Sequence, residues 1–165
     1  MPAYYYAGGR KIALENDDEH VAVDQQAAEK AGLTSSLPTQ SPQRSGGVVL
    51  ASRSALDPDI LARLRSAGAL HPVYKRDRAV VVALPEVRVE FDNEAQRSAV
   101  MAFLKGEPAE HTIAEHTDYG VVVRPTSGSG DDALRMANDI YERAHPASAS
   151  VRFVQFVPKP SVIRS

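Results

Sequence analysis

Apolar and polar residues in the second half of the chain, residues 86–157, follow a pattern that predicts strand, helix, strand, strand, helix and strand. Val87, Val89 and Phe91 alternate with charged residues, as a strand with one buried face requires. The run of three valines at 121–123 is typical of a strand buried in a sheet. We therefore expect a sheet with helices packed against it in this half.

The order of these elements indicates a fold class. We expect a strand at 86–91, a helix from Asn93 to Lys105, strands at 110–115 and 118–124, a turn at 126–130, a helix that begins at Asp131 or Asp132, and a strand at 151–157. Asn and Asp side chains cap helix starts, and a His-Pro pair at 145–146 ends the second helix. This is the split βαβ arrangement of a ferredoxin-like (βαββαβ) domain, so we expect an α+β protein with an antiparallel sheet.

The first half predicts a β-hairpin, a short helix and a further group of elements. Gly8-Gly9 supplies the positive φ angles of a tight turn between strands at 4–6 and 10–14. A strand at 20–23 leads into a helix at 24–31, which Asp24 can cap. A strand at 48–51, a helix at 57–67 and a hairpin at 70–84 then give a β-α-β-β order, which we interpret as partly related to the second half.

Residues 34–47 divide the first half. They are rich in Ser, Thr, Pro and Gln and have little to bury, which predicts an exposed connection, either mobile or ordered. The organisation expected is an N-terminal hairpin and short helix at 1–33, a flexible linker at 34–47, a βαββ portion at 48–85, the ferredoxin-like domain at 86–157 and an extended tail at 158–165.

Composition narrows the classes of function. Hydrophobic residues make up 43% of the 165 residues, which is enough for a packed core. The net charge of -2 lacks the basic surplus that non-specific nucleic-acid binding needs. Cysteine is absent, which excludes disulfides and thiolate chemistry. The start of the sequence has no signal-peptide pattern and no apolar run reaches the ~18 residues of a membrane span, so we expect a cytoplasmic protein with no membrane contact.

Two stretches contain residues that could form a ligand site, but the pattern of each favours an ordinary structural role. Residues 126–132 lie between a strand and a helix, but they lack the phosphate-loop spacing and carry two aspartates where a phosphate would lie. His111 and His116 are five residues apart, which is not the spacing of a zinc helix, so we interpret them as solvent-facing. We expect no metal and no cofactor.

The sequence also contains no residue pattern typical of a catalytic site or of RNA binding. No serine lies in a nucleophile elbow, and the acidic run at 15–19 is typical of a solvated loop. The aromatic residues fit core or partner contacts better than base stacking, and the tyrosines at 4–6 are expected to pack locally. An acylphosphatase-like activity needs an arginine in the loop after the first strand, where Asp92-Asn93-Glu94 stands. We therefore expect a protein that binds rather than catalyses.

Three stretches resemble the propeptide, or N-terminal inhibitor-like region, of bacterial subtilisin-like serine proteases (subtilases). They are YYAGGRKIALE at 5–15 with HVAV at 20–23, VRVEF at 87–91, and residues 131–141 together with SVRFVQFVP at 150–158. In that family the last strand often ends in valine-x-phenylalanine-alanine-x-proline. Gln155 and Phe156 stand here where a small and an acidic residue are usual, so the register of docking differs from the family pattern.

The resemblance implies a mechanism and a set of contact residues. Such propeptides place their open sheet face against two surface helices of the protease, and their tail runs extended into the active-site cleft. Carried over to this chain, the implied partner-binding residues are Phe156, Pro158, Lys159, Pro160, Ser161, Val162 and Ile163. The prolines keep the tail extended and lower the entropy lost on docking, and apolar side chains can fill subsites. The alternative is that residues 158–165 are a frayed terminus with no role in binding.

We accordingly expect a non-catalytic inhibitor or folding chaperone of a subtilisin-like serine protease, with no catalytic residues. The chain can act alone, act on a protease in trans, or be part of a longer protein. The alternative function is a regulatory or scaffolding module whose sheet mediates self-association or docks a different protein, in which case the tail is dispensable.

Overall fold

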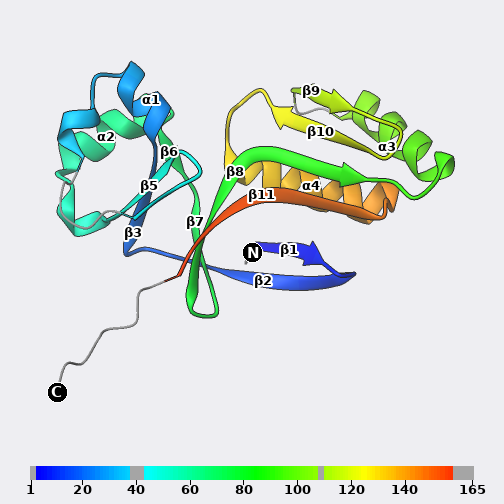
Figure 1. Cartoon of the computed structure of the whole chain (residues 1–165), viewed down its shortest axis with the longest axis horizontal. Coiled ribbons are helices and arrows are strands. Elements are labelled where there is room, and N and C mark those ends of the chain that lie inside the picture. Colours follow the sequence, from blue (N-terminus) through cyan, green and yellow to red (C-terminus); the bar gives the residue numbers. More distant parts are fainter. Residues whose placement is uncertain (1–2, 38–42, 108–109, 158–165) are drawn as a thin grey trace. The chain divides into compact units, whose positions relative to one another are not determined.

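The computed structural model describes residues 3–37, 43–107 and 110–157 (Figure 1). The chain is a mixed α+β protein with antiparallel sheets and, among the described residues, four α-helices. It divides into two compact units. Unit 1 contains residues 1–14 and 83–153, and unit 2 contains residues 15–82 and 154–165. Strands β2, β8 and β11 each contribute residues to both units.

Unit 1 contains the β-α-β-β-α-β order. Its elements are β1 (Ala3–Ala7), the first part of β2 (Arg10–Asn16), the second part of β8 (Ala79–Glu90), α3 (Glu94–Gly106), β9 (His111–His116), β10 (Gly120–Pro125), α4 (Gly130–Ala144) and most of β11 (Ser148–Phe156). β10 pairs antiparallel with β8 and with β9, and β11 pairs with β8. The strands therefore lie in the order β9-β10-β8-β11.

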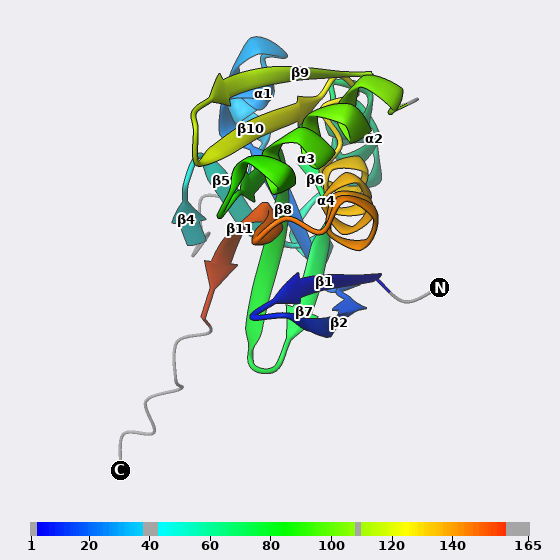
Figure 2. The same ribbon diagram turned by 90° about the vertical axis from the view of Figure 1, so that its right-hand side faces the viewer.

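The core of unit 1 follows the two periodicities of the sequence. Buried and more exposed residues alternate at the end of β8, from Val87 to Glu90, and along β10, and α4 buries a broad apolar face. Figures 1 and 2 show α3 and α4 on the same face of the β9-β10-β8-β11 sheet. The buried residues of this layer include Val87, Val89, Val100, Leu104, Val121, Val123, Leu134, Ala137, Ile140 and Val151.

The β1–β2 hairpin packs on α4. Its turn is Gly8-Gly9, with φ angles of 58° and 76°. The Tyr4 hydroxyl donates to Glu142 Oε1 at 2.8 Å, and the Tyr6 ring stacks on Tyr141 with centroids 4.4 Å apart. The hairpin prediction is confirmed, and the tyrosines do pack locally. The sequence pattern did not predict where the hairpin packs. It belongs to the same unit as the second half of the chain and not with the helix that follows it.

Unit 2 contains the remaining elements. They are β3 (His20–Asp24), α1 (Gln25–Lys30), a short 3-10 helix η1 (Thr34–Ser36), β4 (Gln43–Ser45), β5 (Val48–Ser52), η2 (Arg53–Ala55), α2 (Pro58–Ser66), β6 (Leu70–His71), β7 (Val73–Arg76) and the ends of β2, β8 and β11. One sheet has the order β4-β5-β3-β6, while β7 pairs with the end of β2 and the start of β8. The core consists of Val21, Val23, Ala28, Leu33, Leu37, Val49, Leu56, Leu64 and Ala69.

Several predictions of the domain organisation are corrected. β8 runs without a break across the expected boundary at 85/86, because its apolar residues continue through it. The expected βαββ portion forms no sheet of its own, since Pro72 separates β6, which pairs with β3, from β7, which pairs with β2 and β8. Both ends of the expected linker are structured, as η1 and β4, and residues 38–42 lie outside the described part.

Helix caps agree with the sequence in part. Asp24 caps α1 and Asn93 caps α3, each through a side-chain oxygen that accepts a backbone N–H. α4 starts at Gly130, one residue before the expected Asp131, because the side chain of Ser129 rather than that of an aspartate accepts from the N–H of Asp132. His145 ends α4 in the left-handed conformation, with φ at 51°.

Candidate partner-binding surface

The sheet of unit 1 has a second face, turned away from α3 and α4, which we call the open face. Strand alternation places the residues between the buried ones on it, because successive side chains point to opposite sides. It comprises Glu86, Arg88, Glu90, Val122, Arg124 and Arg152. The side chains of Arg88 and Arg152 are 63% and 49% exposed. Figure 2 shows that neither α3 nor α4 lies on this side of the sheet.

An ion-pair cluster lies near the middle of the open face. Glu86 is only 8% exposed, and its Oε2 lies 3.3 Å from Nη1 of Arg152 on β11. Its Oε1 lies 3.8 Å from Nη2 of Arg88 on the same strand. Arg152 donates a hydrogen bond to the buried carboxylate of Glu86, and the more distant Arg88 adds a second positive charge beside it. The pair between Glu86 and Arg152 joins β8 to β11 by side chains as well as by backbone.

A hollow of about 320 Å³ lies beside this cluster, at the β9–β10 turn. Arg88 and Glu90 line it from β8, and Tyr119 and Val122 line it from the turn and from β10. Gly120 also lines it, and a Cβ there would stand 2.7 Å from the carbonyl oxygen of Val89. Tyr119 is 80% exposed. The hollow can accept a side chain from a partner, and the tyrosine ring offers apolar area at its rim.

The residues expected to contact a partner lie at the other end of β11. Phe156 is 5% exposed, and its burial does not support a contact with a partner. Val157, the next residue, is 62% exposed. Pro158, Lys159, Pro160, Ser161, Val162 and Ile163 lie outside the described residues. The side chains available for contact therefore begin at Val157.

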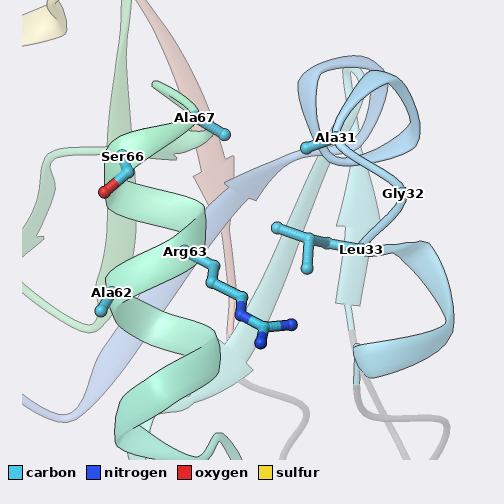
Figure 3. Close-up of a pocket in the computed structure, with 7 residues that line it drawn as sticks. All are labelled: Ala31, Gly32, Leu33, Ala62, Arg63, Ser66 and Ala67. Carbon is cyan, nitrogen blue, oxygen red and sulfur yellow. The ribbon is translucent and has the colours of Figure 1, made fainter.

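A second hollow occurs in unit 2, between the end of α1 and the outer side of α2 (Figure 3). It has a volume of about 500 Å³. Leu33 forms its apolar base, and the side chain of Arg63 extends across it from α2. The other lining residues, Ala31, Gly32, Ala62, Ser66 and Ala67, are small. The groove is shallow and carries one cation, with no acid or nucleophile among its lining residues.

Two histidine–aspartate pairs occur in unit 2, and both serve local structure. Asp17 accepts from the N–H groups of Glu19 and His20 and from the His20 ring, whose Nδ1 is 3.0 Å from Oδ2. His71 Nε2 lies 3.0 Å from Oδ2 of Asp24, whose other oxygen caps α1. Neither imidazole has a hydroxyl partner, so no nucleophile is activated here.

The other sequence candidates have structural roles as well. Ser127 donates to Asp132 at 2.7 Å, which makes the turn before α4 an ordinary capped turn. His111 and His116 lie at opposite ends of β9. In the described ranges, no group of three His, Asp or Glu residues is placed to hold a metal ion. None of the described helices is both long and apolar enough to cross a membrane.

Comparisons with known proteins give no relative. No family model, no curated protein and no solved structure matches the chain. The open face and the end of β11 are therefore judged on their own geometry. Sequence reasoning named the face in general terms but missed the Glu86–Arg152 pair and the Gly120 hollow. Both depend on which strands are neighbours, which alternation along one strand does not encode.

Proposed function

We propose that the chain is a non-catalytic binding protein, an inhibitor or folding chaperone of a subtilisin-like serine protease. Unit 1 would act as a ferredoxin-like docking domain. One observation carries the proposal, namely the strand order β9-β10-β8-β11 with both helices of the β-α-β-β-α-β segment on one face. This order leaves the second face of the four strands without a helix of unit 1 on it.

Two features of the open face favour a protein partner. The guanidinium group of Arg152 is hydrogen-bonded to Glu86 and its side chain is still 49% exposed, so it can donate to a partner without large loss of side-chain entropy, and the exposed Arg88 lies beside it. The hollow next to Gly120 offers a recess for one side chain. Interfaces depend on a few such ordered anchors surrounded by a polar rim.

The tail supplies the second part of the proposed interaction. β11 lies in the sheet and ends at Phe156, and the exposed Val157 starts the segment that continues with Pro158. In our proposal, residues 158–165 enter the active-site cleft in an extended conformation and pair with it as a strand would. Two prolines at 158 and 160 restrict the unbound chain and so reduce the ordering cost of binding.

An inhibition assay tests the proposal. The chain is titrated against a panel of subtilisin-type proteases with a chromogenic peptide substrate, next to a variant that lacks residues 158–165. The proposal expects inhibition by the full chain and a loss of potency of at least about tenfold in the deletion variant, since several main-chain contacts are removed. Absence of both inhibition and complex formation across the panel would overturn it.

The alternative of a scaffolding module gives a different result in the same experiment. There, the partner contacts the sheet alone, so the deletion variant keeps its binding. A chain that binds a protease with equal affinity with and without residues 158–165 would favour the scaffold over the inhibitor.

A further inference from the structure

A third hollow lies in unit 1 and has no role in the proposed interaction with a protease. Its volume is about 400 Å³. Three segments line it, namely residues 6–9 at the end of the β1–β2 hairpin, Tyr141 of α4, and residues 147–150 where β11 begins. The rings of Tyr6 and Tyr141 are stacked on each other, so an aromatic pair forms part of its wall. We call this hollow the tyrosine pocket.

The tyrosine pocket is uncharged. The described residues that line it are all Tyr, Ser, Ala or Gly, whose side chains are neutral at pH 7. The other two hollows differ in this respect, because Arg63 lines the groove in unit 2, and Arg88 and Glu90 line the hollow at Gly120. A charged ligand would lose its hydration in the tyrosine pocket without gaining an opposite charge, which is unfavourable. The pocket therefore favours a neutral ligand.

Three hydroxyl groups of the lining residues are available for hydrogen bonds. Within the part of the chain that the structure describes, the hydroxyl groups of Tyr141, Ser148 and Ser150 bond to no other protein group. A Cβ at Gly9 would lie 3.8 Å from the hydroxyl oxygen of Tyr141, so this hydroxyl lies close to the hairpin turn. Each hydroxyl group both donates and accepts, and so it pairs well with the hydroxyl groups of a ligand.

Backbone groups add to these hydroxyl groups. The two-residue turn makes Ala7 and Arg10 a hydrogen-bonded pair, so the next pair, Tyr6 and Lys11, is not hydrogen-bonded. The N–H and C=O of Tyr6 consequently point away from β2, at the free edge of β1. Among the described strands, β11 pairs with β8 alone, and its residues 148–150 line the pocket as well. Two strand edges thus lie beside the same space.

We propose that the tyrosine pocket binds a neutral sugar. The sugar hydroxyl groups pair with Tyr141, Ser148 and Ser150 and with the edge of β1, while the apolar C–H groups of the sugar contact the two tyrosine rings. The combination of apolar walls, a few hydroxyl groups and a volume within the usual ~300–1,000 Å³ is typical of a small-molecule site. This binding is independent of any interaction with a protease.

A titration followed by NMR tests the site on the full chain. Glucose, galactose, mannose and xylose are added separately to the ¹⁵N-labelled protein, next to glucose 6-phosphate and acetylalanine methylamide. At least one neutral sugar should shift the amide signals of residues 6–9 and 147–150 in a saturable way, and glucose 6-phosphate should bind more weakly because its charge finds no partner.

Variants test whether the hydroxyl groups recognise the sugar. Tyr141→Phe keeps the ring that stacks on Tyr6 and removes only the hydroxyl, so it should weaken binding about three- to tenfold, as should Ser150→Ala. Tyr119→Phe is the matched control, because Tyr119 lines a different hollow, and it should bind like the parent chain.

Three results would overturn the proposal. The first is the absence of a saturable shift at residues 6–9 and 147–150 with all four neutral sugars. The second is binding of acetylalanine methylamide or glucose 6-phosphate more tightly than any neutral sugar, which would indicate a peptide or an anion site. The third is an unchanged affinity in both Tyr141→Phe and Ser150→Ala. Each variant's own amide spectrum shows whether it is folded.

Discussion

At the scale of single residues, Gly120 on the open face has no room for a side chain. An alanine there would place Cβ 2.7 Å from the carbonyl oxygen of Val89, so β8 or β10 must shift. We expect Gly120→Ala to lower the free energy of unfolding by about 1–3 kcal/mol. Gly106→Ala, where a Cβ meets nothing within 4 Å, is the control and should change it by less than about 1 kcal/mol. Urea unfolding measures both.

Asp17 gives the protein a dependence on acid pH. Burial acts to raise the pKa of Asp17, but hydrogen bonds from His20 and from the N–H of Glu19 outweigh it and hold this pKa below its ordinary value. A depressed pKa adds stability above the pKa of the unfolded chain, and this stability is lost as the pH falls through the folded pKa. The contribution should therefore be full at neutral pH and fade below about pH 4.

The variant Asp17→Asn tests this directly. It loses the charged acceptor of three hydrogen bonds, so we expect the free energy of unfolding at pH 7 to fall by about 1–3 kcal/mol and the difference from the parent chain to shrink toward pH 3. Asp18→Asn is the matched control, since Asp18 is exposed next to it. A constant difference from pH 7 to pH 3 would contradict the role of the charge.

At the scale of elements, the contact between the β1–β2 hairpin and α4 depends on Tyr4. The hydrogen bond to Glu142, followed by desolvation, raises the pKa of Tyr4 to about 12. A raised pKa means that the bond stabilises the fold below the ordinary pKa of 10.0 and is lost as the pH rises toward 12. Tyr4→Phe should cost about 1 kcal/mol at pH 7.

Spectrophotometric titration checks the same contact. In the parent chain one tyrosine should ionise last, near pH 12, and Tyr4→Phe should remove that step. Tyr119→Phe is the control, because Tyr119 is 80% exposed and lies away from the hairpin–helix contact, so the late step should remain. If the late step persists in Tyr4→Phe, the hydroxyl of Tyr4 does not carry the bond that ties hairpin to helix.

The elements themselves were largely readable from the sequence. Alternation, caps and glycine turns predicted nearly every helix and strand to within a few residues, because these signals are local. Their partners were not readable. Pairing of β3 with β6, or of β7 with β2, joins residues far apart in the chain and depends on packing. The break at Pro72 and the continuity of β8 through Pro85 reversed what the local pattern favoured.

At the scale of the whole molecule, the candidate site combines a predictable part and an unpredictable part. Alternation alone predicted the outward positions of Arg88 and Glu90 on β8, whereas the valine run at 121–123 predicted a fully buried strand and Val122 is only half-buried. The hydrogen bond between Arg76 and Gln155 could not be predicted from the sequence. The two residues are 79 positions apart, and the pattern assigned their segments to separate domains. The resemblance assigned Phe156 to the partner surface, but Phe156 is the last residue of β11 and is buried, and exposure begins at Val157.

The central claim is that the open face docks on a subtilisin-like protease. Val122 lies in the middle of that face, half-buried, opposite Arg88 and Glu115 on the neighbouring strands. Val122→Arg adds bulk and charge where the partner would sit. Ala102→Arg adds the same side chain at an exposed position of α3, on the other side of the sheet.

The most direct measurement is the inhibition constant of these two variants against a protease that the parent chain inhibits, after circular dichroism shows that both are folded. We predict an increase of at least about tenfold for Val122→Arg, as for the loss of a central anchor, and a change of less than about twofold for Ala102→Arg. Equal inhibition constants for Val122→Arg and the parent chain would contradict docking through the open face.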